Sequence, residues 1–197
     1  MLQIKEIINS IFNSKTYILY KYGEDNAWLV DIGDIAPVIT FLHRMNLSVA
    51  GLFITHAHFD HIYGILDLLE HYPDCKVYVT EYAKEGLASE KLNMSKYYDA
   101  LDSIIYDGEN VIVVHDGDKV MLYEGEPYMH LYETPGHNPG CLTMVQGNVI
   151  FTGDSYIPGI SVTTNIRYGD KEQAQASLLK ITKLAEGKIV FSGHQII

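Results

Sequence analysis

The pattern of hydrophobic and polar positions in the first half of the chain predicts alternating strands and helices. Short runs of β-branched, aromatic and other apolar residues favour strands, because such residues suit a pleated and half-buried backbone. These runs lie at residues 16–20, 27–31, 50–54 and 75–80. Apolar residues three and four apart predict amphipathic helices. The predicted helices lie at residues 37–45 and 62–71, with two shorter helical stretches at 81–87 and 95–103.

The second half begins again with short strands, which Asp-Gly, Glu-Gly and Gln-Gly-Asn turns separate. These strands are expected at residues 111–114, 120–123, 128–133, 142–145 and 149–152, followed by a helix at 171–185 and a strand at 188–191. This order predicts an α+β fold in which two β-sheets pack face to face with helices outside. No linker or repeat interrupts the sequence, so residues 1–197 are expected to form a single domain.

Composition narrows the class of protein. The chain of 197 residues carries 14 basic and 25 acidic side chains, which gives a formal net charge of −11. A nucleic-acid backbone binder needs clustered Lys and Arg, so no nucleic-acid partner is expected. The sequence contains no apolar run of membrane-spanning length and no basic region followed by a long apolar region, so neither a membrane partner nor secretion is expected. Two cysteines are too few for a disulfide framework, which favours a cytoplasmic location. Assembly into a homo-oligomer is left open.

The densest chemistry lies in the segment THAHFDH, residues 55–61, directly after a predicted buried strand. If the backbone stays extended, side chains two residues apart point the same way, so His56, His58 and Asp60 would share one side. His61 would turn round as the next helix begins. Clustered polar groups at a strand end are costly unless something satisfies them, and imidazoles and carboxylates are ligands of zinc, iron and manganese. The segment therefore predicts a metal site, although Asp60 alone would also suit a helix cap.

Three further segments place one ligand-type residue in a loop or after a strand. His137 lies in the Pro/Gly-rich loop TPGHNPG, Asp154 lies in FTGDS, and His194 lies in FSGH. Each segment is a weak signal alone. Together they are expected to bring these side chains to the strand ends near residues 55–61.

This combination resembles the metallo-β-lactamase superfamily, whose pattern is HxHxDH, then a lone His, a lone Asp and a lone His. The segment VDIG at residues 30–33 also resembles the acidic turn of that family. The resemblance implies a four-layer αββα sandwich and a site for two metal ions. It implies one ion on His56, His58 and His137, a second on Asp60, His61 and His194, and Asp154 bridging the two.

The resemblance further implies a metal-dependent hydrolase with two Zn²⁺ ions, or alternatively iron or manganese. Two dications lower the pKa of a shared water, and the resulting hydroxide would attack a small ester, thioester or lactone-like molecule. Asp60 and His194 are the expected catalytic residues, with Asp60 holding the nucleophile through its second oxygen. Two alternatives stay open: an oxidoreductase similar to mononuclear iron persulfide dioxygenases, and a small phosphodiesterase.

The expected substrate residues lie near this site. Arg167 is the only cation of residues 156–169 and would meet an anionic group of the substrate, or else pair with Asp170 on the surface. Tyr63 would line the pocket or face the core. Cys141 is expected to be a buried small residue, and Asp31 either a turn residue or a support of the site.

The resemblance is to the glyoxalase II-like branch. The C-terminal helical region that grips glutathione in those relatives does not follow His194 in this sequence. The expected substrate is therefore small, and its identity is left open.

Overall fold

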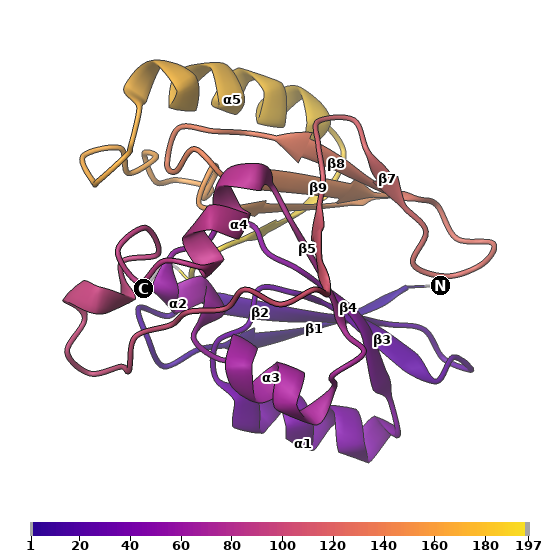
Figure 1. Ribbon diagram of the computed structural model, residues 1–197. Coiled ribbons are helices and arrows are strands. Elements are labelled where there is room, and N and C mark those ends of the chain that lie inside the picture. Colours follow the sequence, from indigo (N-terminus) through magenta and orange to yellow (C-terminus); the bar gives the residue numbers. More distant parts are fainter. Residues whose placement is uncertain (1, 196–197) are drawn as a thin grey trace.

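Two β-sheets form the centre of the computed structural model, which describes residues 2–195 (Figure 1). The first sheet has the order β1-β2-β3-β4-β5-β6, with bounds Gln3–Ile8, Lys15–Tyr20, Asn26–Val30, Ser48–Phe53, Lys76–Val79 and Val111–Val113. The second has the order β11-β10-β9-β8-β7, with bounds Ile189–Ser192, Val149–Gly153, Leu142–Gln146, Met129–Glu133 and Lys119–Val120. Each sheet contains both parallel and antiparallel pairs, for example β3 with β4 and β1 with β2 in the first sheet.

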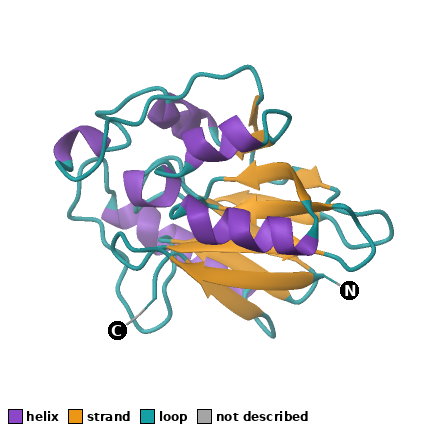
Figure 2. Cartoon of the chain, turned by 90° about the horizontal axis from the view of Figure 1, so that it is seen from below, coloured by secondary structure: helices purple, strands orange, loops and turns teal. Residues whose placement is uncertain are grey.

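Helices cover the outer face of each sheet and complete four layers (Figure 1). Helices α1 (Ile35–Met45) and α3 (Ile65–His71) lie on the first sheet, and α5 (Lys171–Leu184) lies on the second. The shorter elements are α2 (Phe59–Ile62), α4 (Glu81–Leu87) and the 3₁₀ helix η1 (Ser95–Tyr97). Figure 2 shows long loops gathered at the end of the sandwich that carries the C-terminus. The α+β sandwich predicted from the sequence is confirmed.

Three apolar clusters separate the four layers, because the side chains of a strand alternate between its two faces. On β2, Ile18 packs in the cluster beneath α1 and α3, whereas Tyr17 and Leu19 pack in the cluster between the sheets. A smaller cluster around Ile150 and Ile181 joins the second sheet to α5. Within residues 2–195, no helix is both long enough and apolar enough to cross a membrane.

The structure corrects three predicted elements. The helix expected at residues 95–103 is wrong beyond Tyr97, because side-chain hydrogen bonds fix a loop there. Asn93 Nδ2 donates to the carbonyl of Ile104, and Ile104 N donates to Ser95 Oγ. The strand expected at residues 120–123 ends at Val120.

Residues 122 and 123 do not continue β7 in the second sheet, because they form hydrogen bonds with residues of the first sheet. Trp28 Nε1 donates to the carbonyl of Leu122, and the Tyr123 hydroxyl donates to the carbonyl of Asn26. Strand β1 was not predicted, because its sequence QIKEII mixes charged and apolar residues at the edge of the sheet.

The helix expected at residues 62–71 is divided at Gly64. Gly64 N donates to the carbonyl of Ile32 at 3.2 Å, and a Cβ on Gly64 would lie 2.1 Å from the carbonyl oxygen of Gly33. The absence of a side chain thus lets the junction between α2 and α3 contact the chain that follows β3. This contact sets α2 against the turn that contains Asp31.

We predict that Gly64→Ala lowers the free energy of unfolding by about 2–4 kcal/mol, because the new Cβ would displace backbone rather than a flexible side chain. Urea denaturation measures this loss. Gly125→Ala is the control: Gly125 has a φ of +77° and open space around its Cβ position, so only backbone strain of about 1 kcal/mol is expected. A Gly64→Ala protein as stable as the Gly125→Ala protein would contradict the close approach.

Candidate metal centre

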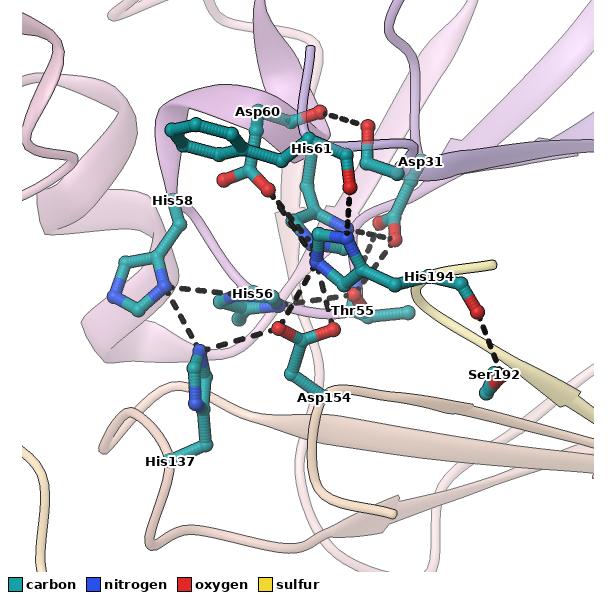
Figure 3. A network of polar contacts seen from close by, with 12 residues as sticks. Asp31, Thr55, His56, His58, Asp60, His61, His137, Asp154, Ser192 and His194 are labelled. Carbon is teal, nitrogen blue, oxygen red and sulfur yellow. Dashed lines mark hydrogen bonds and ion pairs between the residues drawn. The ribbon is translucent and has the colours of Figure 1, made fainter. Parts of the chain in front are cut away.

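Seven ligand-type side chains from four separate segments meet where the loops gather (Figure 3). Four come from the segment after β4, one from the loop between β8 and β9, one from the end of β10 and one from the end of β11. In chain order these residues are His56, His58, Asp60, His61, His137, Asp154 and His194. The structure therefore brings together every residue that the sequence predicted as a ligand.

The first group consists of three buried imidazoles. His56 Nε2 and His137 Nε2 each lie 3.0 Å from His58 Nδ1. The exposed fractions of these residues are 0%, 5% and 4% for His56, His137 and His58. Three buried ring nitrogens directed at one another suit a shared cation.

The second group joins two imidazoles to a carboxylate. His61 Nε2 lies 3.2 Å from His194 Nε2, and Asp60 Oδ2 lies 3.5 and 3.4 Å from these two atoms. Asp154 reaches both groups, since its Oδ2 lies 3.5 Å from His137 Nε2 and 3.2 Å from His194 Nε2. The two groups are thus adjacent, with Asp154 between them.

The backbone explains the division into two groups and corrects one prediction. The chain is extended at His58, with φ −69° and ψ 144°, but α2 begins at Phe59. Asp60 and His61 are therefore helical, and the extended path that would place Asp60 beside His56 and His58 is wrong. The helical step directs Asp60 and His61 toward His194 instead.

The donor set fits divalent ions on chemical grounds. Within residues 2–195, Asp154 Oδ1 is a buried carboxylate oxygen with no hydrogen-bond partner, although His61 Nε2 lies 3.5 Å from it. Such an atom is costly unless a cation or donor satisfies it. In each of three overlapping groups, the ligand atoms lie within 4.8 Å of one another. Imidazole nitrogen and carboxylate oxygen are the ligand types that zinc and similar transition metals take.

Asp31 connects the centre to the first sheet. Its Oδ1 accepts a hydrogen bond from Thr55 N at 2.7 Å, and its Oδ2 accepts from Thr55 Oγ1 at 2.7 Å and contacts His61 Nδ1 at 2.8 Å. Asp31 has a φ of +55°, which few residues other than Gly, Asn and Asp adopt readily. The contact fixes the orientation of the His61 ring, so Asp31 supports the centre and is more than a turn residue.

Four other contacts hold the remaining rings by the nitrogen that faces away from the centre. His137 Nδ1 lies 2.9 Å from the carbonyl of Thr163, and His194 Nδ1 lies 2.9 Å from the carbonyl of Phe12. The other two are His56 Nδ1 with Thr55 Oγ1 and His58 Nε2 with the side-chain amide of Asn138. Sequence reasoning missed these partners. Backbone carbonyls leave no residue-type signal, whereas the polar Asn138 beside His137 was a signal that could have been used.

The two groups differ in their electrostatics. Burial and the neighbouring imidazole of His137 lower the pKa of His58 to about 3. Burial also lowers the pKa of His56 well below its usual value. At His61 burial acts in the same direction, but the carboxylates of Asp60, Asp154 and Asp31 outweigh it and raise the pKa to about 10. In the metal-free protein at neutral pH, the first group is therefore neutral and the second holds protons.

The structure places the other residues singled out from the sequence away from the ligand atoms. The Tyr63 hydroxyl donates to Asp34 Oδ1 at 2.7 Å. Arg167 Nη1 donates to the Tyr97 hydroxyl at 2.8 Å. The alternative pairing with Asp170 is not what the described residues show, because Asp170 accepts hydrogen bonds from the first turn of α5. Cys141 is buried as expected, and burial raises the pKa of its thiol to about 12.

We predict that metal affinity depends on pH at the second group only. Below its raised pKa, His61 binds a proton that a metal must displace, and the pKa of His194 is raised as well by the carboxylate of Asp154, so affinity should rise at least about tenfold per pH unit between pH 6 and 9. The first group carries no proton there, so its affinity should stay constant. Competition titrations against a chromophoric chelator at pH 6, 7 and 8 measure both. A pH-independent second site would contradict this electrostatic asymmetry.

We also predict that Asp31→Asn weakens metal binding at the second group by about 10–100-fold, because the amide orients His61 less well than the carboxylate does. Asn tolerates the left-handed backbone, so the turn should persist. The same chelator competition gives the affinity. Asp34→Asn is the matched control, since Asp34 contacts Tyr63 and Ser10 but no ligand ring. Equal affinities of the two variants would show that Asp31 does not position the centre.

Comparisons with known proteins agree with this geometry. The sequence pattern of the metallo-beta-lactamase superfamily matches residues 12–194. The hydroxyacylglutathione hydrolases of Vibrio campbellii and Tolumonas auensis are 31% and 28% identical to the chain, and each alignment covers 99% of it. The chain spans about two thirds (66%) of the length of each of these relatives.

Among solved structures, the BLEG-1 B3 metallo-beta-lactamase is 28% identical, with a TM-score of 0.86 over 98% of this chain and 92% of that one. The chain belongs to the metallo-beta-lactamase superfamily.

Proposed function

We propose that this protein is a metal-dependent hydrolase that holds two divalent ions, zinc first among them, and cleaves a small ester, thioester or lactone-like molecule. The observation that carries the proposal is the convergence of two ligand groups on one shared carboxylate, Asp154. The relatives named hydroxyacylglutathione hydrolases favour a thioester among these substrate classes.

The residues have distinct proposed roles at such a centre. One ion would be held by His56, His58 and His137, a second by Asp60, His61 and His194, and both by Asp154. Bound divalent ions supply an activated water and polarise the oxygen of the scissile carbonyl. The orientation of the rings comes from the chain itself, through Asp31 and the loop carbonyls.

Asp60 and His194 are the proposed catalytic residues. Asp60 Oδ2 faces His61 and His194, which leaves Oδ1 to accept a hydrogen bond from the attacking water. The side chain of His194 is 18% exposed and that of Asp154 is 12% exposed, whereas His61 is fully buried. Substrate therefore reaches the centre from the side of His194 and Asp154.

Three other expectations from the sequence stay predictions. They are a pocket role for Tyr63, the folding of the chain as a single domain, and a cytoplasmic location.

Metal analysis combined with a substrate panel tests this function. We expect about two transition-metal ions per chain and hydrolysis of at least one member of a panel of thioesters and lactones. His58→Ala should reduce kcat/KM by more than about 100-fold, because it removes a ligand rather than a supporting contact. His43→Ala is the control, since His43 is exposed on α1.

Four outcomes would reject the proposal or its substrate class. The first is a protein that binds no metal when zinc is added, and the second is full activity of His58→Ala at full metal content. The third is oxygen consumption with one iron per chain, which would identify the oxidoreductase. Hydrolysis of phosphodiesters alone would reject the ester and thioester classes.

A further inference from the structure

The carbonyl of Asp60 is held by a side chain from outside its helix. In a continuous α-helix, the N–H of Gly64 would donate to this carbonyl, four residues earlier. Gly64 N donates instead to the carbonyl of Ile32 at 3.2 Å, just after α2 ends. The hydroxyl of Ser14 takes its place, since Ser14 Oγ donates to the Asp60 carbonyl at 2.7 Å. A residue 46 positions earlier in the chain therefore completes the hydrogen bonding of α2.

This bond is buried, and a second side chain sets its direction. Ser14 is 0% exposed and Asn9 is 1% exposed, so bulk water does not compete for either side chain. Asn9 Oδ1 accepts a hydrogen bond from Asp34 N at 3.1 Å, which leaves Asn9 Nδ2 to donate to Ser14 Oγ at 3.1 Å. Because Ser14 Oγ accepts from Asn9, its own proton is left for the carbonyl of Asp60.

The backbone of Ser14 is paired with the segment that carries His194. Ser14 and His194 form an isolated antiparallel bridge. The next residue extends this pairing, because Lys15 N donates to the carbonyl of Gly193 at 2.8 Å. Asp60 and His194 turn toward each other in the centre, with Asp60 Oδ2 3.4 Å from His194 Nε2 (Figure 3). Ser14 thus contacts both segments, one through its side chain and the other through its backbone.

Asp60 depends on support at its backbone. Each of the five histidine rings contacts a group outside the ligand set through its second nitrogen. Within residues 2–195, the Asp60 carboxylate forms ion-pair contacts only with His61 and His194, which are ligands themselves. In the same part of the chain, Ser14 forms no hydrogen bond with the three histidines of the first group. Its contacts lead to the second group alone.

We propose that Ser14 is a positioning residue for the second ligand group, and that its hydroxyl sets the backbone of Asp60 so that the carboxylate faces a bound metal ion. Loss of the hydroxyl would leave a buried carbonyl without a partner, so α2 would shift toward another donor. The pairing of Ser14 with the His194 segment keeps these two ligands in register. This inference rests on the two-metal centre of the proposed function and deepens it.

Metal affinity measured separately at the two groups tests the proposal. Competition for Zn²⁺ between the protein and a chromophoric chelator should show two binding steps, and the step that His61→Ala loses belongs to the second group. Ser14→Ala should weaken that step about tenfold and leave the other step unchanged. Ser14→Thr keeps a hydroxyl and should retain most of the affinity. Ser14→Cys fills the site with a weak donor, so it should weaken the same step, and it carries the test if Ser14→Ala does not fold.

Ser177→Ala is the matched control. Ser177 is 6% exposed, and its Oγ donates to the carbonyl of Pro135 at 2.6 Å, in the loop that carries His137. This variant loses a buried bond of the same kind, so its free energy of unfolding, measured in urea without metal, should also fall. The second binding step should nevertheless stay unchanged, because Ser177 lies on the side of the first group.

The outcomes separate this inference from the proposed function. A second step that is unchanged in Ser14→Ala, in a protein that hydrolyses its substrate, would overturn the inference and keep the function. Equal weakening of both steps would also overturn it, because that result shows general loosening of the fold. Weakening of the second step alone, in a protein that hydrolyses no member of the substrate panel, would keep the role of Ser14 and reject the proposed function.

Discussion

The metal centre depends on the hydrogen bonds of one carboxylate, Asp31, at the end of β3. Asp31 accepts from the backbone and hydroxyl of Thr55 and contacts the ring of His61, so one side chain links two strand ends to the ligand-bearing segment. Asp31 makes these bonds from a left-handed backbone, and Gly64 lets the next helix approach the turn that follows Asp31. Such strain is tolerated where the surrounding structure over-determines it, as the three contacts of the Asp31 carboxylate do here.

The loops contribute to the centre through their backbone. The carbonyls of Phe12 and Thr163 hold His194 and His137 by the ring nitrogen that faces away from the ligand cluster. A change in either loop would therefore alter the orientation of the ligand ring that its carbonyl contacts.

Local patterns in the sequence predicted the layers and the ligand residues, because strand alternation and clustered histidines are local signals. The path of Asp60 was predicted wrongly, since a four-residue helix is too short to show periodicity. Partners such as Thr163 could not be predicted, because any residue supplies a carbonyl. The contact of Arg167 with Tyr97 joins positions 70 residues apart and needs the tertiary fold.

The central claim is that the chain builds two adjacent ligand groups that share Asp154. Anomalous scattering from crystals of the metal-loaded protein tests it most directly. The account predicts two peaks. One should lie about 2.0–2.1 Å from nitrogens of His56, His58 and His137, and the other at similar distances from His61 and His194, with Asp154 in contact with both. A single peak, or a second peak away from Asp154, would contradict it.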